Sequence, residues 1–514
     1  MNKMKLFYLI ALSFFINVTA NAAFPTTPLS GGGDGTQANP YKIATANDLI
    51  EVRVAIASAA GTGVALSYYE LASDIDLSSV ANWGGIGAYN NSFKGHFDGK
   101  GFSIAGVKAG TADSRFNSSI VGFFGFIDGA TISNLTLDIS FYTAFTPTTS
   151  DTGPTGGGLV NTTVGTGNNV INNCKVTGVI DVLANDASVS VARTLARVGG
   201  VIGTAGSSGS GTTTIINTST NINLLAKNDG SVTKITANAA AICGGIVGEV
   251  KNSVQTIEIV NCSVSGEVNA TSTNFGGYAG GVLSTFSSVN AISKIINTVA
   301  KNSVKCVSGT NHTDAFAGGI ITKHFNANNI VNYCIALNTI ISVNKNTAGD
   351  PIINRIGLNN QGVFSNNYAK SGLLVQKTIQ GVGPETLSII RVDPASKDGA
   401  DMGGNPINES ITKLNDYIAV NPVYSGIALT TWTNNDFTTV ANTYVHNQLS
   451  LIPVVSQNTV SLDIDLETRL LQVYSLAGER IMQQKVTGST SFSLQKGIYI
   501  LNVTGYKPCK IIIM

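Results

Sequence analysis

The sequence predicts an all-β protein whose main body is a parallel β-helix (β-solenoid), with a short N-terminal helical segment and a small C-terminal β-sandwich-like domain. Three observations predict this fold. A glycine pair followed by two aliphatic residues recurs through the middle of the chain. An Ile-x-Asn triplet follows each pair at a similar distance. Val, Ile, Thr, Asn and Gly outnumber strong helix formers in these units.

The repeat is defined by its glycine and asparagine markers. The second glycine recurs at intervals of 36 to 45 residues, whereas 13 to 17 residues separate it from the following asparagine. Because the distance inside the unit varies less than the interval between units, the variable length is expected in loops. A diverged copy beginning at VGFFG (121–125) adds a sixth asparagine. The glycine markers are Gly158, Gly200, Gly245, Gly281 and Gly319; the asparagine markers are Asn134, Asn173, Asn217, Asn261, Asn297 and Asn332.

A wound β-ribbon explains why residues that weaken strands recur beside its best strands. Glycine suits a place where another backbone approaches closely. Asparagine tolerates a left-handed backbone, and its amide can bond to the amides above and below it in a stack. We therefore expect the asparagines to form one row along a corner. A phosphate-binding glycine loop is disfavoured because no GK[ST] or GxGxxG context is present.

The N-terminus has the order of a secretory signal peptide. Lys3 and Lys5 precede an apolar run, and Ala20-Asn21-Ala22 follows it, which predicts removal of residues 1–22 and a mature chain without a transmembrane segment. Residues 46–60 read as a helix with Asn47 or Asp48 as its N-cap and Gly61 as its stop.

Composition excludes some partners. The net charge is +1, charged residues make up 12%, and no basic stripe is present, so no nucleic-acid partner is expected. Six cysteines without a CxxC motif predict buried apolar packing rather than a disulfide framework or a zinc site.

The domain organisation follows from where the repeat stops. We expect the β-helix over residues 23–384, a cap or connector over 385–455 with a helix at 410–420, and the C-terminal domain over 456–514. A cap is expected because an open β edge at the last coil would pair with other chains.

No catalytic or cofactor-binding residue is predicted, since HExxH and GxSxG are both missing. Asp74 and Asp76 lie two residues apart on one strand face and are candidates for a calcium site, with a structural role at strand ends as the favoured alternative. His312, Asp314 and His324 could be drawn as a metal cluster, but a solvated loop is favoured.

The repeat resembles the GLUG-type motif family of bacterial surface and secreted proteins. Residues 244–268 (GGIVGEVKNSVQTIEIVNCSVSGEV) and 158–179 carry the closest resemblance, within a stretch covering roughly 31–340. Thr218, Thr298 and the Tyr333-Cys334 pair depart from the pattern, which argues against a continuous cysteine ladder. The resemblance implies an adhesin-like or accessory surface module.

The C-terminal segments VYSLAGERI (473–481), FSLQKGIYILNV (492–503) and CKIIIM (509–514) resemble the sorting domain of Bacteroidetes type IX secretion substrates. The Asn-Pro opening of that family is missing. This resemblance implies the type IX secretion machinery as a partner, with a secreted or outer-surface product. A terminal β-sandwich cap or adhesion module is the alternative.

These observations predict a non-enzymatic, adhesin-like surface protein that presents variable loops on a solenoid and binds a glycan, matrix or protein ligand. The alternative is a polysaccharide lyase or glycoside hydrolase of the parallel β-helix class, which would share the fold and compartment. Ca²⁺ is the one cofactor considered.

Overall fold

The computed structural model describes most of the chain, and the statements below refer to that part. The described residues are 29–58, 62–147, 153–185, 194–230, 240–251, 255–286, 291–310, 314–324, 326–347, 349–359, 362–389, 391–437, 449–450, 453–456, 459–463, 469–475, 480–487, 489–503, 506–507 and 509–513. The expected signal peptide and His312 lie outside them.

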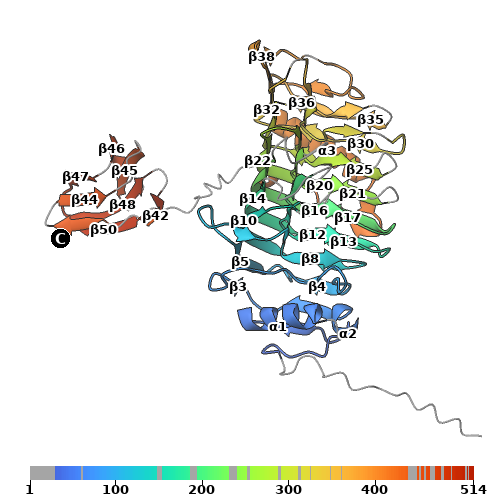
Figure 1. The fold of residues 1–514 in the computed structure, drawn as a ribbon, viewed down its shortest axis with the longest axis horizontal. Helices are drawn as coiled ribbons and strands as arrows, with labels where there is room; N and C mark the ends of the chain where they lie inside the picture. Colours follow the sequence, from blue (N-terminus) through green and yellow to red (C-terminus); the bar gives the residue numbers. More distant parts are fainter. Residues whose placement is uncertain are drawn as a thin grey trace, which may run out of the picture.

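Each full coil of the solenoid contributes four strands in a fixed order. In one coil these are β15 (Leu195–Gly199), β16 (Ile202–Ala205), β17 (Thr212–Ile216) and β18 (Ser219–Asn228). Every one pairs in parallel with its equivalent in the next coil. One sequence repeat is therefore one coil, and the coils stack into the column seen in Figure 1.

The strands before and after the asparagine corner form two long parallel sheets, here called sheets A and B. Sheet A contains β1 (Tyr41–Ile43), β2 (Tyr68–Leu71), β4 (His96–Asp98), β9 (Thr131–Ser133), β13 (Asn169–Asn172), β17, β21 (Thr256–Val260), β25 (Ile292–Ile296), β30 (Ile330–Asn332) and β35 (Val363–Ser365). Sheet B contains β3 (Ile75–Asp76), β5 (Ser103–Ala109), β6 (Phe116–Asn117), β10 (Thr136–Phe145), β14 (Lys175–Ala184), β18, β22 (Ser263–Ser272), β26 (Val299–Ala300), β27 (Ser303–Ser308), β31 (Ile335–Ala336), β32 (Ile340–Lys345), β36 (Tyr368–Lys370), β37 (Leu374–Ile379), β38 (Gly383–Leu387) and β39 (Ala400–Met402).

The strands on either side of the glycine pair form sheets C and D. Sheet C contains β7 (Ile120–Val121), β11 (Thr155–Gly157), β15, β19 (Ala240–Gly244), β23 (Gly276–Gly280), β28 (Ala315–Gly318) and β33 (Ile352–Asn354). Sheet D contains β8 (Phe124–Ile127), β12 (Val160–Thr163), β16, β20 (Val247–Val250) and β24 (Leu283–Phe286), and the pair β29 (Lys323–His324) and β34 (Leu358–Asn359) follows it.

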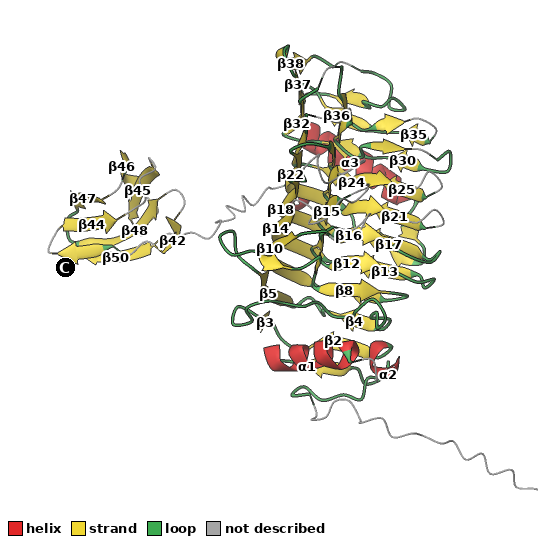
Figure 2. Cartoon of the chain, viewed as in Figure 1, coloured by secondary structure: helices red, strands yellow, loops and turns green. Residues whose placement is uncertain are grey.

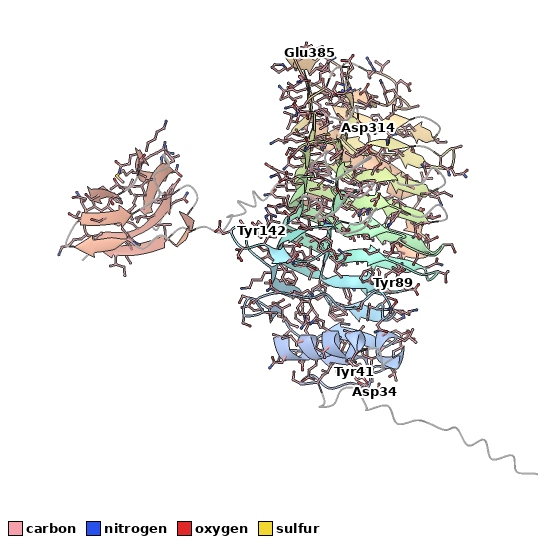
Figure 3. All side chains as sticks on the ribbon, in the orientation of Figure 1. Asp34, Tyr41, Tyr89, Tyr142, Asp314 and Glu385 are labelled. Carbon is pink, nitrogen blue, oxygen red and sulfur yellow. The ribbon has the colours of Figure 1, made fainter. Side chains whose placement is uncertain are left out.

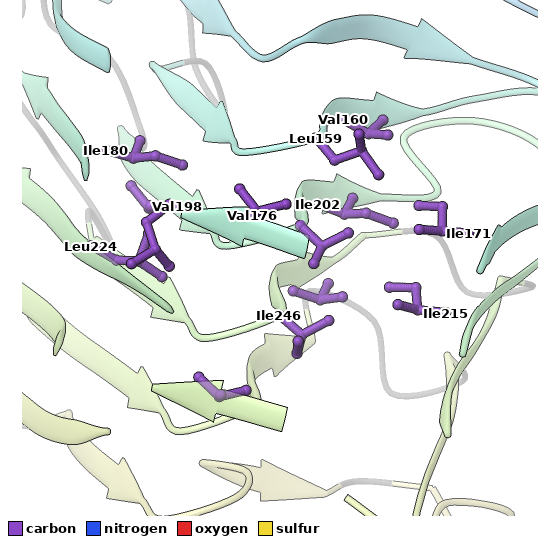
Figure 4. Packing of buried hydrophobic residues seen from close by; sticks show 14 of the residues in the cluster. Leu159, Val160, Ile171, Val176, Ile180, Val198, Ile202, Ile215, Leu224 and Ile246 are labelled. Carbon is purple, nitrogen blue, oxygen red and sulfur yellow. The ribbon is translucent and has the colours of Figure 1, made fainter. Parts of the chain in front are cut away.

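The core runs through the column between the four sheets. Figure 4 shows aliphatic side chains from successive coils, among them Val176, Ile202, Ile215 and Ile246, gathered between the strands. All four are fully buried, and each such side chain contributes about 1.5–3 kcal/mol by leaving water. The period-two alternation of the strands places Val176 and Ile215 inside, and Ile246 points inward from the turn between β19 and β20.

The glycine pair makes the turn from sheet C to sheet D, and no side chain fits there. A Cβ on Gly200 would lie 2.2 Å from the carbonyl oxygen of Gly245, and one on Gly245 would lie 2.1 Å from that of Gly281. Close approach of the next coil therefore requires glycine at this position. The row ends at Arg355, whose guanidinium donates to the carbonyl oxygens of Asp398 and Gly399, each at 3.0 Å, and so ties down the terminal segment.

Cysteine and threonine alternate in one inward row just after the corner. The hydroxyl of Thr218 accepts from the backbone N–H of Cys174, and that of Thr298 accepts from Cys262, each at 3.3 Å. Burial raises the pKa of the Cys174 and Cys262 thiols to about 12, so they stay protonated. These two cysteines are two coils apart, about 9.6 Å along the stack, which is too far for a disulfide.

The N-terminal end is covered by α1 (Ala46–Ala57), followed by α2 (Thr62–Ala65), as Figure 2 shows. The expected N-caps, Asn47 and Asp48, are corrected by the structure: Thr45 is the N-cap. Its hydroxyl accepts from the Asp48 N–H at 3.2 Å, while the Asp48 carboxylate accepts from the Thr45 N–H at 2.9 Å. The helix ends at Ala57 with Ser58 as its C-cap, and Gly61 lies outside the described residues.

The solenoid continues past the expected boundary at 384. β39 pairs in parallel with β36, so residues 400–402 still belong to sheet B. α3 (Pro406–Val420) then begins four residues earlier than expected, because Asn405 caps it and Pro406 occupies its first turn. A short hairpin, β40 (Val423–Tyr424) and β41 (Ile427–Ala428), and the 3₁₀ turn η1 (Asn434–Asp436) follow.

The C-terminal unit is a small antiparallel β structure with its own core. Its sheets are β43-β44-β47 and β46-β45-β48-β50, with β42 paired to β49, and the unit begins by Leu449 rather than at 456. Their inner faces share buried residues such as Val460, Leu471 and Leu501. The strands are β42 (Leu449–Ser450), β43 (Val454–Ser456), β44 (Thr459–Asp463), β45 (Arg469–Ser475), β46 (Arg480–Val486), β47 (Ser489–Ser493), β48 (Gly497–Val503), β49 (Tyr506–Lys507) and β50 (Cys509–Ile513).

We predict that Gly245→Ala destabilises the solenoid by about 2–3 kcal/mol, because the new methyl overlaps a backbone oxygen that cannot move without separating two coils. Urea unfolding followed by circular dichroism measures this. Gly404→Ala is the matched control, since its Cβ meets nothing within 4 Å. Equal stability of the two variants would contradict the prediction.

Candidate functional site

The asparagine corner between sheets A and B is a continuous structural row. Asn134, Asn173, Asn217, Asn261 and Asn297 all have φ between 51° and 55°. Left-handed backbone at this position lets each coil turn from sheet A into sheet B, and asparagine adopts it more readily than other side chains. Each of their backbone N–H groups donates to a carbonyl oxygen of the next coil. The N–H of Asn217, for instance, donates to the carbonyl oxygen of Val260 at 3.1 Å.

The last expected marker, Asn332, does not occupy the corner and lies one residue before it. Strand register pairs Asn332 with Ile296, and Tyr333 takes the corner with φ 53°. The sequence spacing predicted the wrong corner residue in this coil, because the Tyr333-Cys334 pair shifts the corner by one residue. As Tyr333 has no amide, the buried Oδ1 of Asn297 has no hydrogen-bond partner in the described part of the chain. Tyr333 instead packs on Tyr417 of α3, with ring centroids 5.1 Å apart.

The side-chain amides form a ladder that breaks once. Asn173 donates to Asn134 Oδ1 at 2.9 Å, Asn261 to Asn217 Oδ1 at 2.8 Å, and Asn297 to Asn261 Oδ1 at 2.9 Å. Between these two runs, Asn217 donates to Asn172 Oδ1 at 3.2 Å instead of to Asn173. The Oδ1 of Asn173 therefore lacks the bond that its counterparts accept.

Residues 421–437, here called the strap, fold back over the outside of the corner after α3. The ladder holds its backbone directly: Asn217 donates to the Ala428 carbonyl at 2.9 Å and accepts from the Thr430 N–H at 3.1 Å. Asn261 donates to the Thr430 carbonyl at 2.8 Å. The amides thus bind an extended segment as a neighbouring β-strand would.

Apolar contacts decide where the strap and α3 lie. Ile216, Val260 and Ile296 precede the corner asparagines of three successive coils and point outward into a cluster with strap and helix residues. The equivalent residues of earlier coils are polar, Ser133 and Asn172. An apolar residue directly before the corner asparagine was thus the available sequence signal for this docking site. The strap and α3 contribute Leu414, Tyr417, Ile418, Leu429, Trp432 and Phe437.

A polar pocket of about 180 Å³ lies between the corner and the strap. Its walls come from three successive coils around the ladder break and from the strap, which are far apart in sequence. The solenoid supplies Asn173, Asn217, Thr218, Ser219, Asn261 and Ser263, and the strap supplies Thr430, Thr431, Trp432 and Asp436. Apart from the three asparagines, none of these residues was singled out as a site by sequence reasoning, because the strap's position follows from tertiary packing.

One lysine fastens the end of the strap. Lys301 Nζ donates to the carbonyl oxygen of Asp436 and lies 5.6 Å from the centre of the Phe437 ring. Burial lowers the pKa of Lys301 to about 8, with the nearby Asp436 acting in the opposite direction. Docking the strap therefore requires a charged ammonium to lose water at neutral pH.

The other acidic candidates, Asp74 and Asp76, are exposed and lie just before and at the end of the short strand β3. Asp74 Oδ1 accepts from the backbone N–H and the hydroxyl of Ser103 at 2.7 and 2.9 Å, and Asp76 accepts from Ser78 in the same manner. These bonds lower the pKa of both exposed carboxyls. Each carboxylate is thus held by a different serine, Asp74 by Ser103 and Asp76 by Ser78. Within the described residues, no three His, Cys, Asp or Glu side chains are grouped so as to hold a metal ion.

Asp314 was also considered as a metal ligand. Its carboxylate accepts from the hydroxyl of Tyr278 at 2.5 Å, and it is labelled in the upper half of the stack in Figure 3. Tyr278 stacks on Phe316 with ring centroids 5.3 Å apart, and Lys323 Nζ lies 4.3 Å from the Phe316 ring centre. Asp314 therefore belongs to an aromatic and cationic cluster on the outer face of sheet C.

Comparison with known proteins gives partial matches. No family model matches the chain. A protein of Evansella cellulosilytica named as a Gly-rich membrane protein is 35% identical over 118 residues, which are 22% of this chain and 12% of that protein. Halomucin of Haloquadratum walsbyi is 29% identical over 178 residues, or 32% of this chain and 2% of halomucin. A solved IgA1 protease aligns with a TM-score of 0.39 at 13% identity, over 91% of this chain and 34% of that one.

The chain thus spans a small part of these relatives. Among the described residues, no helix combines the length and apolar character needed to cross a membrane.

We predict that Asn261→Ala costs about 2–4 kcal/mol of unfolding free energy, since it loses amide hydrogen bonds and forces alanine into a left-handed conformation. Asn261→Gly loses only the bonds and should cost about 1 kcal/mol less. Asn223→Ala, on the outward face of β18 and away from the corner, is the control and should cost little. Urea denaturation measures all three. A glycine variant as unstable as the alanine variant would contradict the role of the backbone geometry.

We predict that strap docking strengthens as pH rises from about 8 to 10.5. The folded-state pKa of Lys301 is depressed, so the undocked chain binds more protons in this window and the docked state gains stability with pH. Urea unfolding of wild type and Lys301→Met between pH 7 and 10.5 tests this. Wild type should gain stability relative to the variant, and parallel pH profiles would contradict the assignment.

Proposed function

We propose that the chain is a secreted, surface-exposed, adhesin-like scaffold that presents loops on a rigid solenoid to bind a glycan, matrix or protein ligand. The observation that supports this proposal is that the strands keep one register from coil to coil, whereas the loops between them vary. The ten-residue strands β14, β18 and β22 pair in unbroken register, residue against residue.

The loops leave each coil at two fixed places, between sheets D and A and between sheets B and C. Residues 164–168 and 206–211 occupy the same place in successive coils, yet they differ in length and sequence. Because the ladder hydrogen bonds lie in the strands, such loops can vary without disturbing the stack. Stacking also places neighbouring loops about 4.8 Å apart along the column, which suits recognition of an extended surface.

Export is supported by the N-terminal signal pattern and by the C-terminal unit. We propose that the unit from residue 449 onward acts as the type IX sorting domain that its strand sequences resemble, and that the type IX machinery is the partner that reads it. The relative named as a membrane protein is consistent with a location in the cell envelope, although the match covers 12% of it.

An epitope inserted after Ser210, an exposed loop residue, should be labelled by antibody on intact producing cells, with little change in melting temperature. Deleting residues 449–514 should abolish the surface label while leaving the solenoid folded, as judged by circular dichroism. A label that requires cell permeabilisation in the full chain would contradict surface display. Surface labelling that survives the deletion would contradict only the sorting role.

Ligand recognition is tested separately with arrays of glycans and matrix proteins and the purified full chain. Retention of an array ligand without product release is expected. Release of oligosaccharides from any polymer would replace the proposal with the lyase or hydrolase alternative.

A further inference from the structure

We infer that the pocket between the asparagine corner and the strap binds a single neutral sugar ring, such as the terminal unit of a glycan. The inference rests on the proposed role in surface recognition and adds a ligand class and a location. It places recognition at the corner of the solenoid in addition to its loops.

Some polar groups in the pocket already have hydrogen-bond partners within the protein, whereas others have none among the described residues. The side-chain amides of Asn217 and Asn261 are already hydrogen-bonded to other ladder asparagines and to the strap backbone. Asn173 is different: it is exposed, and its Oδ1 accepts no bond in the described part of the chain, because the ladder breaks there. Its amide can still accept a hydrogen bond from a ligand hydroxyl.

Hydroxyl groups line the remaining walls. Ser219 and Ser263 occupy the first outward position of adjacent sheet B strands, and they pair in register. Neither side chain bonds to another described residue, and the same holds for the hydroxyls of Thr430 and Thr431. Each hydroxyl is both donor and acceptor, so the set matches a ring that carries several hydroxyls of its own.

Charge favours a neutral ligand. Asp436 is the one ionisable side chain that lines the pocket, and its Oδ2 already accepts from the N–H of Thr433 at 2.7 Å. The nearby cation, Lys301, is directed to the Asp436 carbonyl and the Phe437 ring. An anionic ligand such as a phosphate would face a carboxylate with no opposing cation on the pocket wall.

The size of the pocket and the aromatic side chain in its wall both fit a ligand of one sugar ring. At about 180 Å³ the pocket is smaller than the roughly 300–1,000 Å³ of sites for drug-sized ligands, so a longer chain must leave it. Trp432 lines the pocket and is 7% exposed. Its buried indole N–H has no partner among the described residues.

A peptide is the competing ligand class, because the ladder already binds the extended strap. The amides that hold that backbone, on Asn217 and Asn261, are occupied by it. The groups left over are mainly hydroxyls on the pocket wall rather than a second row of amides. The observations therefore favour a polyhydroxylated ring over a second peptide.

Saturation-transfer NMR of the full chain with millimolar methyl glucoside, methyl galactoside, methyl mannoside and N-acetylglucosamine tests the inference. At least one should bind, and Ser263→Ala and Asn173→Gly should each weaken it about 2- to 10-fold; glycine is used at residue 173 because it keeps the left-handed corner backbone. Ser265→Ala is the matched control: it lies two residues along the same strand face, outside the pocket, and should change nothing. Thr431→Trp should block binding by filling the space.

The inference fails if no glycoside binds, if binding survives Thr431→Trp, or if Ser265→Ala weakens binding as much as Ser263→Ala. It also fails if a synthetic peptide with the strap sequence binds in place of the glycosides. Array binding that persists in the Thr431→Trp variant would leave the proposed surface role standing and remove only this site. Glycoside binding without any surface label on cells would leave this site standing and remove the proposed surface role.

Discussion

The whole architecture depends on parallel hydrogen bonding between successive coils held about 4.8 Å apart. This spacing leaves no room for a side chain where sheet C turns into sheet D, because a Cβ on the second glycine of each pair would lie only 1.8 to 2.2 Å from a carbonyl oxygen of the next coil. It also brings equivalent corner amides within bonding distance of each other. The glycine and asparagine markers are therefore two consequences of one constraint, and the variable loops lie where the constraint does not act.

The corner asparagines bond to each other along the stack of coils, and some of them also bond to the strap outside it. In the interior of a run, each amide donates to the coil below, as Asn261 does to Asn217. Where outward apolar residues such as Ile216 and Val260 adjoin the corner, the same amides also hold the strap. The ladder shifts by one residue beneath the strap, from Asn173 to Asn172, and Asn173 lines the polar pocket.

The ends of the column are closed by different means, because a solenoid has no neighbour there to satisfy its edges. At the N-terminal end, α1 buries Leu49, Val52 and Ile56 against the first strands. At the other end, Arg355 replaces glycine in its row, and its guanidinium binds the carbonyls of the segment that follows. An arginine can stand there because no regular coil lies beyond it.

The sequence alone determined the β-helix and the corner residues from Asn134 to Asn297, since periodic spacing reflects contacts repeated between neighbouring coils. That each repeat makes one coil was decided by the strand pairing in the structure. The sequence could not place Tyr333 at the corner, because a one-residue shift changes the register without changing the motif. Nor could it reveal the strap or its pocket. Residues such as Asn217 and Thr430 meet only once α3 has packed against the column, a long-range contact that leaves no periodic trace in the chain.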